Sequence, residues 1–461
     1  MFFLSKRAVA VIFSTAILIC PASAIASKID LDAGVYSEIV WTDNVDLAAS
    51  KRESDVYLMI NPYVRANHIG RRIKSSFDYQ LRAAAYQQHS GMNDLQHLLR
   101  GDLGVDLIRD NVFVDFYLAQ ESEVVDANKA ISFDGFSYGA NTANSYTGKV
   151  MPRGILPIVG DIGVDFSSSH GKIVYDQGID DILEHQAHVS LGTGARSAGL
   201  NWGLSARKQY VQIENSHPSE YEQLDVSTSF PIFSRVLISA KYGEKREVLS
   251  SSNNRSWNQG EIWNGKIIYA ISSKTNVQFG GGNDLYGDNV IISFQQETKR
   301  SKLKLDYSES EVTTLTAGLI EDVTGSNPWE LIYIDDIYVQ KKGAIKWKLA
   351  GVRNTIDIFL KREDRYYRNL GTDETLYAAN LHWKHRFSGR SDLIANINWW
   401  RLGGGSESRL DDIALYSLKY ARGIFQNSNW YISGKAGIRD GTQTALEYKQ
   451  LIFLIGAELR Y

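Results

Sequence analysis

Cysteine is almost missing from this chain of 461 residues, whose single cysteine is Cys20. We predict that Cys20 is removed with an N-terminal leader, so that the remaining chain has no thiol. Disulfide bonds, thiolate metal sites and a cysteine nucleophile are then excluded as the basis of its fold or activity. A lipid-anchored cysteine is also disfavoured, because Ile19 stands where lipoprotein signals carry a small residue.

Proline is scarce as well, and so are long apolar segments. The chain has seven prolines against 38 glycines, 25 tyrosines and ten tryptophans, a balance that favours strands rich in aromatic residues. Beyond the N-terminus, no apolar run approaches the ~20 residues of a membrane-spanning helix. The formal net charge is only −3, and neither charge nor motif indicates nucleic-acid binding.

The N-terminus has the features of a secretory leader. Lys6 and Arg7 precede an apolar run over residues 8–19, and small residues at 22–24 or 24–26 offer a cleavage site. The run is too short for a spanning helix, so we expect cleavage rather than anchoring. The predicted organisation is a signal peptide over residues 1–26 and one exported domain over residues 27–461.

Hairpins fill the rest of the sequence. Segments of ten or more alternating residues are joined by ten short turns, such as Gly160-Asp161, and by eleven longer loops, such as residues 125–145. This pattern predicts an all-β fold, a single antiparallel up-and-down transmembrane barrel of about 22 strands. The connection at residues 282–289 is the least clear, and its merging or splitting would give 20 or 24 strands.

The faces of individual strands support a barrel. Phe77 and Tyr79 alternate with Asp78. At the C-terminus, one face carries Phe453, Ile455, Leu459 and Tyr461, and the other carries Gly456, Glu458 and Arg460. One face of each strand therefore suits lipid and the other suits water. Soluble β-sandwiches also alternate, but they rarely show so many consecutive hairpins without a domain boundary. A β-propeller is disfavoured because no blade-length repeat is present.

The charged face is the candidate functional surface. Its predicted lumen-lining residues are Asp78, Arg82, Arg100, Asp102, Asp106, Asp357, Lys361, Glu458 and Arg460. Mixed charge interspersed with tyrosine and tryptophan suits hydrated sugar chains, which offer hydroxyl groups and apolar ring faces. The same residues are also consistent with a salt-bridge network that only stiffens the wall.

No catalytic, cofactor-binding or metal-binding residues are predicted, and we do not expect an enzyme. His188 and Ser190 superficially resemble the histidine and serine of outer-membrane phospholipases, but their parity places them in the lumen, away from phospholipid. His185 and His188 fall on opposite faces of a strand, which disfavours a shared metal.

An acidic loop is the remaining candidate for a metal site. Asp176, Asp180, Asp181 and Glu184 lie close together in sequence, and hard cations bind such carboxylates. The spacing is not that of an EF-hand, so a solvated loop is favoured. The long segment over residues 125–145 is expected either to fold inward and meet a partner or to be a surface loop.

Several short motifs resemble a known family. Thr42-Asp43-Asn44, Asn61-Pro62-Tyr63, Gly70-Arg71-Arg72 with Tyr79 and Tyr86, and Arg353-Asn354-Thr355 are similar to landmarks of the PEP-CTERM system-associated outer-membrane proteins. The resemblance spans essentially the whole exported chain. It implies a barrel encoded beside exosortase and exopolysaccharide genes that serves polysaccharide secretion, and it supplies no catalytic residues.

The C-terminal strand also resembles the signal read by the barrel-assembly machinery. Gly456, Leu459 and Tyr461 occupy the expected positions, whereas Leu454 stands where a polar residue is usual. Tyr461 is equally consistent with an ordinary interfacial aromatic residue. The predicted partners are therefore outer-membrane lipid and the assembly machinery, together with a polysaccharide chain and periplasmic export components.

Three functions remain open at this point. The first is an outer-membrane conduit for exopolysaccharide, the second a general diffusion or nutrient porin, and the third an outer-membrane enzyme or scaffold. A plugged transporter is disfavoured because no globular domain precedes the first strand at Ile29. An unplugged lumen of this width would leak, so closure by a loop or a partner is expected. The predicted location is the outer membrane of a Gram-negative bacterium.

Overall fold

The computed structural model describes most of residues 29–461. The described residues are 29–124, 142–177, 179–193, 199–215, 217–248, 258–285, 287–312, 338–367, 371–404, 409–442 and 447–461. The predicted signal peptide over residues 1–26 and most of the long segment 125–145 lie outside them.

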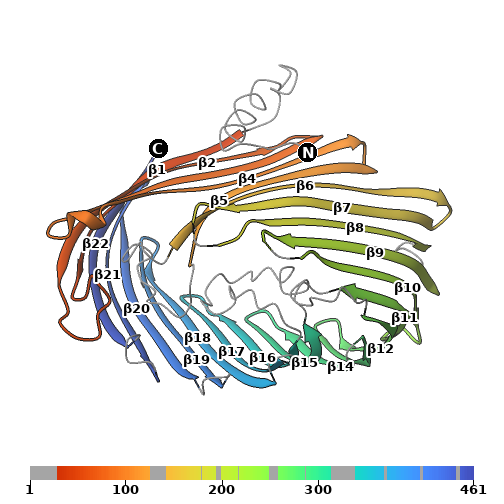
Figure 1. The fold of residues 1–461 in the computed structure, drawn as a ribbon. Coiled ribbons are helices and arrows are strands. Elements are labelled where there is room, and N and C mark those ends of the chain that lie inside the picture. The colour runs from red at the N-terminus through yellow and green to blue at the C-terminus, as the bar shows by residue number, and fades with distance from the viewer. Residues whose placement is uncertain are drawn as a thin grey trace.

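Twenty-two strands make up the wall (Figure 1). They are β1 (Ile29–Thr42), β2 (Asp55–Ile69), β3 (Ile73–Tyr86), β4 (Asp94–Ile108), β5 (Val112–Val124), β6 (Thr142–Val159), β7 (Ile162–Tyr175), β8 (Ile182–Thr193), β9 (Asn201–Ile213), β10 (Ser219–Pro231), β11 (Val236–Val248), β12 (Asn258–Ser272), β13 (Thr275–Asp284), β14 (Gly287–Glu297), β15 (Ser301–Val312), β16 (Tyr338–Ala350), β17 (Asn354–Tyr367), β18 (Thr372–Ser388), β19 (Ser391–Gly404), β20 (Arg409–Phe425), β21 (Ser428–Gly441) and β22 (Tyr448–Arg460). A short 3-10 turn, η2 (Ser90–Met92), lies between β3 and β4. Among the described residues, no helix combines the length and apolar character needed to cross a membrane.

Each strand pairs antiparallel with the next, and β22 pairs with β1 to close the barrel. The predicted fold class is therefore confirmed. The uncertain connection at residues 282–289 is a true hairpin, because β13 ends at Asp284, β14 begins at Gly287 and the two strands pair along their length. This hairpin fixes the number of strands at 22.

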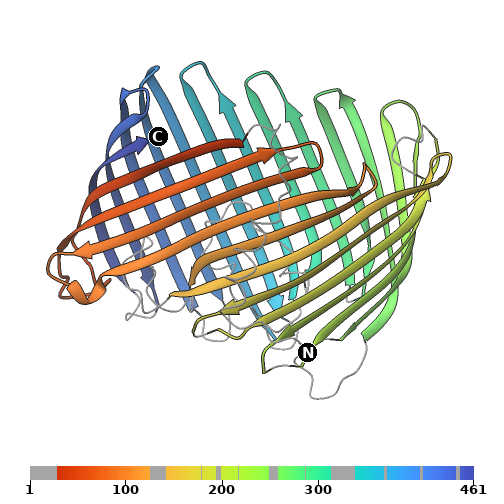
Figure 2. The ribbon, with the colours of Figure 1, turned by 90° about the horizontal axis from the view of Figure 1, so that it is seen from above.

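Two of the short turns are made by residues that tolerate positive φ. Asp110 has φ 62° and Gly160 has φ 55°, and each lies in a tight turn between paired strands. Figure 2 shows short hairpins along one end of the barrel and the described longer connections, such as those between β1 and β2 and between β3 and β4, at the other. The two rims of the barrel therefore differ, because one carries short turns and the other carries longer loops.

Exposure alternates along the closing strand as the sequence predicts. Phe453, Ile455 and Leu459 on β22 are 56%, 62% and 46% exposed and belong to the face that carries the large apolar side chains. The opposite face of the strand is mostly buried, including Leu454 at 6%. Because side chains alternate with a period of two, the face with Phe453, Ile455 and Leu459 contacts lipid and the face with Leu454 points into the barrel.

Leu454 belongs to an apolar cluster on the inner face. This cluster contains Val40, Tyr57 and Ile452 from the wall and Val45 from the loop between β1 and β2. Val45 is fully buried, so the loop over residues 43–54 packs against the inside of the wall rather than extending away from it. The apolar residue at position 454, unusual for a closing strand, is explained by this packing.

Candidate functional site

The inner face of β1 to β6 carries a row of charged side chains, which we call the charged stripe. It consists of Asp32, Arg65, Asp78, Arg100, Asp102, Asp115 and Arg153. Strand register brings these residues together, because Arg65 lies opposite both Asp32 and Asp78, and Asp78 lies opposite Arg100. Side chains directly opposite one another on neighbouring strands are close enough to interact.

Ion pairs link the charged stripe across strands. Arg65 Nε lies 2.9 Å from Asp78 Oδ2, and Arg65 Nη1 lies 3.9 Å from Asp32 Oδ2. Arg153 Nε lies 2.7 Å from Asp115 Oδ2. These side chains are between 30% and 53% exposed. The pairs therefore order the surface while each contributes little to stability, about 0–1 kcal/mol.

Aromatic rings underlie three of the arginines. The guanidinium of Arg65 lies 4.8 Å from the centroid of the Tyr63 ring, and that of Arg100 lies 5.4 Å from the Tyr117 ring. Arg153 is 4.5 Å from the Phe113 ring. Such cation–π contacts hold long arginine side chains against the wall. The inner surface here thus combines fixed charge, hydrogen-bonding groups and ring faces.

Glu458 and Arg460 extend this surface at the closing strand. Glu458 Oε1 accepts a hydrogen bond from Tyr63 Oη at 3.3 Å and lies 2.6 Å from Arg460 Nε. Tyr63 is also the ring beneath Arg65, so β22 and the charged stripe are joined through one side chain. Of the predicted lumen-lining residues, the structure therefore brings Asp78, Arg100, Asp102, Glu458 and Arg460 to one region of the inner wall.

Arg82 and Asp106 share the inner face but lie at the two sides of this region. Arg82 is opposite Gln96, closer to the rim of longer loops. Asp106 lies beside a register shift near the short turn, where its carboxylate accepts a hydrogen bond from the amide of Asp110 at 3.3 Å. Asp106 thereby helps to order the turn.

Asp357 and Lys361 are on β17, in a different part of the wall. Asp357 forms a 3.4 Å ion pair with Lys348. Lys361 Nζ lies 2.6 Å from Glu363, which also contacts Arg365 at 2.6 Å. The side chains of Lys361, Glu363 and Arg365 are between 1% and 9% exposed and pack within the wall. Because they lie on β17, they are remote from the charged stripe on β1 to β6.

The predicted parity of the histidines holds. His188 lies opposite Ser167 and Arg207 on the inner face, and its Nδ1 is buried without a hydrogen-bond partner. His185 is on the outer face, where its Nδ1 is 3.0 Å from that of His170. An imidazole that no carboxylate orients is a poor general base, and the two histidines share no site.

The acidic loop residues each have a protein partner. Asp176 accepts hydrogen bonds from the backbone amide and Nδ2 of Asn144 at 2.9 and 2.7 Å. Asp181 lies 3.1 Å from Lys172 Nζ, and Glu184 lies 3.6 Å from Lys149 Nζ. Asp180 accepts a hydrogen bond from Asn215 Nδ2 at 3.3 Å. These carboxylates hold loop and strand ends together, and the interpretation as a solvated loop stays a prediction.

Sequence reasoning missed two features of the inner surface. Arg65, Asp115 and Arg153 were not singled out, although each has the parity of the inner face. It also missed a group formed by Asp46, Glu53 and His89, whose ligand atoms lie within 4.8 Å of one another. These three residues come from two loops, so no local spacing in the sequence could have indicated them.

Comparison with known proteins identifies the kind of barrel. No protein-family model and no curated protein sequence matches the chain. Among solved structures, it is similar to the ferric-catecholate import receptor Fiu of E. coli K12, with a TM-score of 0.54, 8% identity, and 93% of this chain and 82% of that chain covered. It is also similar to the FrpB iron transporter of Neisseria meningitidis, with a TM-score of 0.55, 7% identity, and 94% and 83% covered. The siderophore receptor PirA of Pseudomonas aeruginosa matches with a TM-score of 0.50, 9% identity, and 93% and 80% covered.

These likenesses concern the fold. Together with the closed wall of 22 antiparallel strands, they show that this chain is an outer-membrane β-barrel. Its place is the outer membrane of a Gram-negative bacterium, with the apolar outer face in lipid.

Proposed function

We propose that the protein is an outer-membrane pore that serves as a conduit in exopolysaccharide secretion. The observation that carries this proposal is the charged stripe with its underlying rings at Tyr63, Tyr117 and Phe113. A moving sugar chain needs hydrogen-bond partners for its hydroxyl groups that exchange readily. It also needs aromatic side chains along which its apolar ring faces can slide. Half-exposed arginines stacked on aromatic rings supply both.

The chemistry of the charged stripe also favours weak, repeated contacts over tight binding. Its cations are already paired with carboxylates, as in the 2.9 Å contact of Arg65 with Asp78, so a passing ligand meets no strong unpaired charge. Conduction requires sites that bind weakly enough to release. The resemblance to barrels of exopolysaccharide loci supports the same cargo.

A general diffusion or nutrient porin is the second candidate. The same exposed inner surface supports it, because mixed charge favours hydrated solutes of either sign. The iron import carried out by the structural neighbours is not transferred to this chain, since identities of 7–9% indicate the fold alone. The third hypothesis, an enzyme or scaffold, has no catalytic arrangement among the described residues to support it.

Deletion of the gene, with secreted and cell-bound polysaccharide measured separately, tests the conduit. We expect secreted polysaccharide to fall and cell-associated polysaccharide to rise, and complementation to restore both. Unchanged secretion would overturn the export proposal. Conductance of the purified barrel in planar bilayers then separates the candidates, because a porin conducts alone whereas a conduit closed by partners conducts little until it is gated.

Variants of the charged stripe connect the phenotype to the surface. Arg65→Ser with Arg100→Ser should impair complementation by the gene. Arg401→Ser is the matched control, since Arg401 forms a 2.7 Å ion pair with Asp412 on the outer face. Equal complementation by the double variant and by Arg401→Ser, at equal barrel abundance, would argue that the charged stripe only stiffens the wall.

A further inference from the structure

The loop between β1 and β2 is built to hold two acidic side chains at a fixed place. The amide of Val45 donates to the carbonyl of Glu53 at 2.8 Å, which draws the two sides of the loop together. Asn44 Nδ2 donates to the carbonyls of Ala48 and Lys449 at 2.9 Å. Because Val45 is completely buried in the inner apolar cluster, the loop is anchored to the wall.

A buried carboxylate fixes His89 in the loop between β3 and β4. Asp55, whose side chain is fully buried, accepts hydrogen bonds from the backbone amide of His89 at 2.9 Å and from that of Gln88 at 3.1 Å. The same carboxylate lies 2.9 Å from His89 Nδ1. Three contacts from Asp55 thus fix both the backbone and the imidazole ring of His89.

The other ring nitrogen of His89 faces a second carboxylate. Its Nε2 lies 2.8 Å from Glu53 Oε2, and the two residues are 36 positions apart in the chain. A contact of this length between an imidazole nitrogen and a carboxylate is attractive when a proton lies between them, or when a cation takes the place of that proton. Because Asp55 retains the proton on Nδ1, Nε2 is the nitrogen available to a cation.

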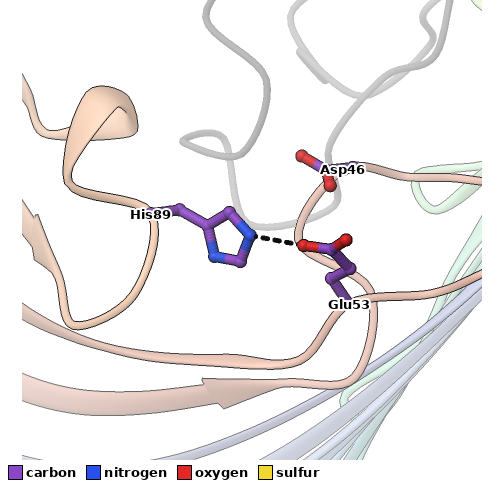
Figure 3. Close-up of side chains that lie close together, drawn as sticks. All are labelled: Asp46, Glu53 and His89. Atoms are coloured by element: carbon purple, nitrogen blue, oxygen red, sulfur yellow. Dashed lines mark hydrogen bonds and ion pairs between the residues drawn. The ribbon is translucent and has the colours of Figure 1, made fainter.

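Asp46 completes the arrangement. One oxygen of Asp46, one of Glu53 and one ring nitrogen of His89 lie within 4.8 Å of one another, and Figure 3 shows the three side chains converging from the two loops. We propose that this group is a binding site for a divalent transition metal such as zinc, at the rim of longer loops. The proposal is independent of what passes through the pore.

The donor set decides the class of metal. One imidazole nitrogen and two carboxylate oxygens suit zinc and its neighbours, whereas calcium and magnesium prefer oxygen donors alone. Ligands around a tetrahedral zinc ion stand about 3.4 Å apart, so movements of about 1 Å by the side chains complete the site. Glu53 is 62% exposed and is free to make such a movement. Three protein ligands leave the fourth position to water.

Asp55 acts as a positioning residue in this site. A carboxylate that accepts the Nδ1 proton of a metal-binding histidine fixes the ring and makes Nε2 a better donor. When the ring is doubly protonated, zinc binding releases the Nε2 proton to solvent. The affinity should therefore rise with pH, because a ligand has to lose its proton before it binds the metal. The charged groups that face His89 are Glu53, Asp55 and Asp46.

Calorimetric titration of the full, refolded and chelator-treated barrel with zinc sulfate tests the site. We expect one zinc ion per chain at pH 7.5, and binding at least tenfold weaker at pH 5.5. His89→Ala and Glu53→Gln should each weaken binding by at least tenfold, and Asp55→Asn by about 10- to 100-fold. His97→Ala is the control, because the Nδ1 of His97 contacts the Tyr79 hydroxyl on another part of β3 and β4.

Folding is checked on every variant by circular dichroism and by the gel mobility of the unheated barrel. Asp46→Asn, a change at a half-buried loop side chain, gives a second test with little risk to the fold and should also weaken binding. Absence of zinc binding by the folded parent chain would overturn the proposal. So would equal zinc affinity in the parent chain, His89→Ala and Asp46→Asn.

Discussion

The amide nitrogen of Tyr461 donates a 2.7 Å hydrogen bond to the carbonyl oxygen of Ala33. The residue that directly follows the closing strand is therefore engaged with the first strand, next to the register pair of Gly34 with Arg460. Tyr461 itself is 82% exposed, which fits an aromatic residue at the membrane interface. Its role as part of an assembly signal stays a prediction.

The lipid face of the closing strand should not tolerate charge. Ile455, near the middle of β22, is 62% exposed on the apolar face. Ile455→Arg should lower the free energy of unfolding by about 2–4 kcal/mol, because a charge at the midplane of the bilayer loses its hydration. Reversible urea unfolding in lipid vesicles measures this change in the free energy of unfolding. Gln80→Arg, on the inner face of β3, should change the stability by less than about 1 kcal/mol, and equal costs would contradict the assignment of faces.

Glu363 should be far more sensitive to substitution than an exposed charged residue of the same strand. It lies between Lys361 and Arg365, and its side chain is 1% exposed. Glu363→Ala should cost about 3–5 kcal/mol, since it leaves two buried cations without their shared partner. Asp357 is paired with Lys348, and the two side chains are 38% and 60% exposed. Asp357→Ala should therefore cost only about 0–1 kcal/mol. Denaturant titrations of both variants measure the loss in the free energy of unfolding. Equal losses for the two variants would contradict the role assigned to burial.

Gly456 is required by packing as well as by any assembly signal. A Cβ added at this position would lie 2.6 Å from Tyr431 Cζ, and the Tyr431 hydroxyl is held by a hydrogen bond to Glu38. Gly456→Val should therefore destabilise the folded barrel by about 1–3 kcal/mol. Gly148→Ala is the control, because its added Cβ would meet Leu118 at an ordinary 3.5 Å. A Gly456→Val barrel that assembles slowly but unfolds at the parent urea concentration would point to signal recognition alone.

His89 should make the loop contact depend on pH in the absence of metal. Hydrogen bonds to Glu53 and then to Asp55 raise the pKa of His89 above its usual value. A raised pKa in the folded state means that the stabilisation is fully present below about pH 6.5, the ordinary histidine value, and is lost as the pH rises through the higher folded value. Amide exchange in residues 43–54 and 87–93, corrected for intrinsic rates, should show protection that falls over that interval in chelator. His89→Gln should remove the pH dependence, and a parent chain without it would contradict the ion-pair assignment.

Strand number and strand faces could be predicted from local sequence because both depend on short-range rules. A period of two separates Asp78 from Phe77, and turn residues such as Gly160 end one strand before the next begins. Closure could be inferred from the even strand count. These features need no knowledge of which residues pair.

The parts that could not be predicted depend on register and on loops that return to the wall. The charged stripe exists because Arg65 lies opposite Asp78, and Arg153 opposite Phe113, which parity alone does not specify. Val45 stands in an apparently polar loop, yet it is buried in the inner cluster. His89 contacts Glu53 because the loop of Val45 packs inward. The spacing of residues along the sequence does not indicate this contact.

The pairing of β22 with β1 has a consequence for how the chain must be handled before it folds. Tyr63 and Glu458 touch across the seam although 395 residues separate them, and β22 is synthesised after all the strands that it closes. Every shorter nascent chain would present two open strand edges, which are templates for aggregation. Contacts between residues so distant in sequence also form slowly. The newly made protein therefore needs protection during its passage to the membrane, and completion of the wall has to wait for the last segment to arrive.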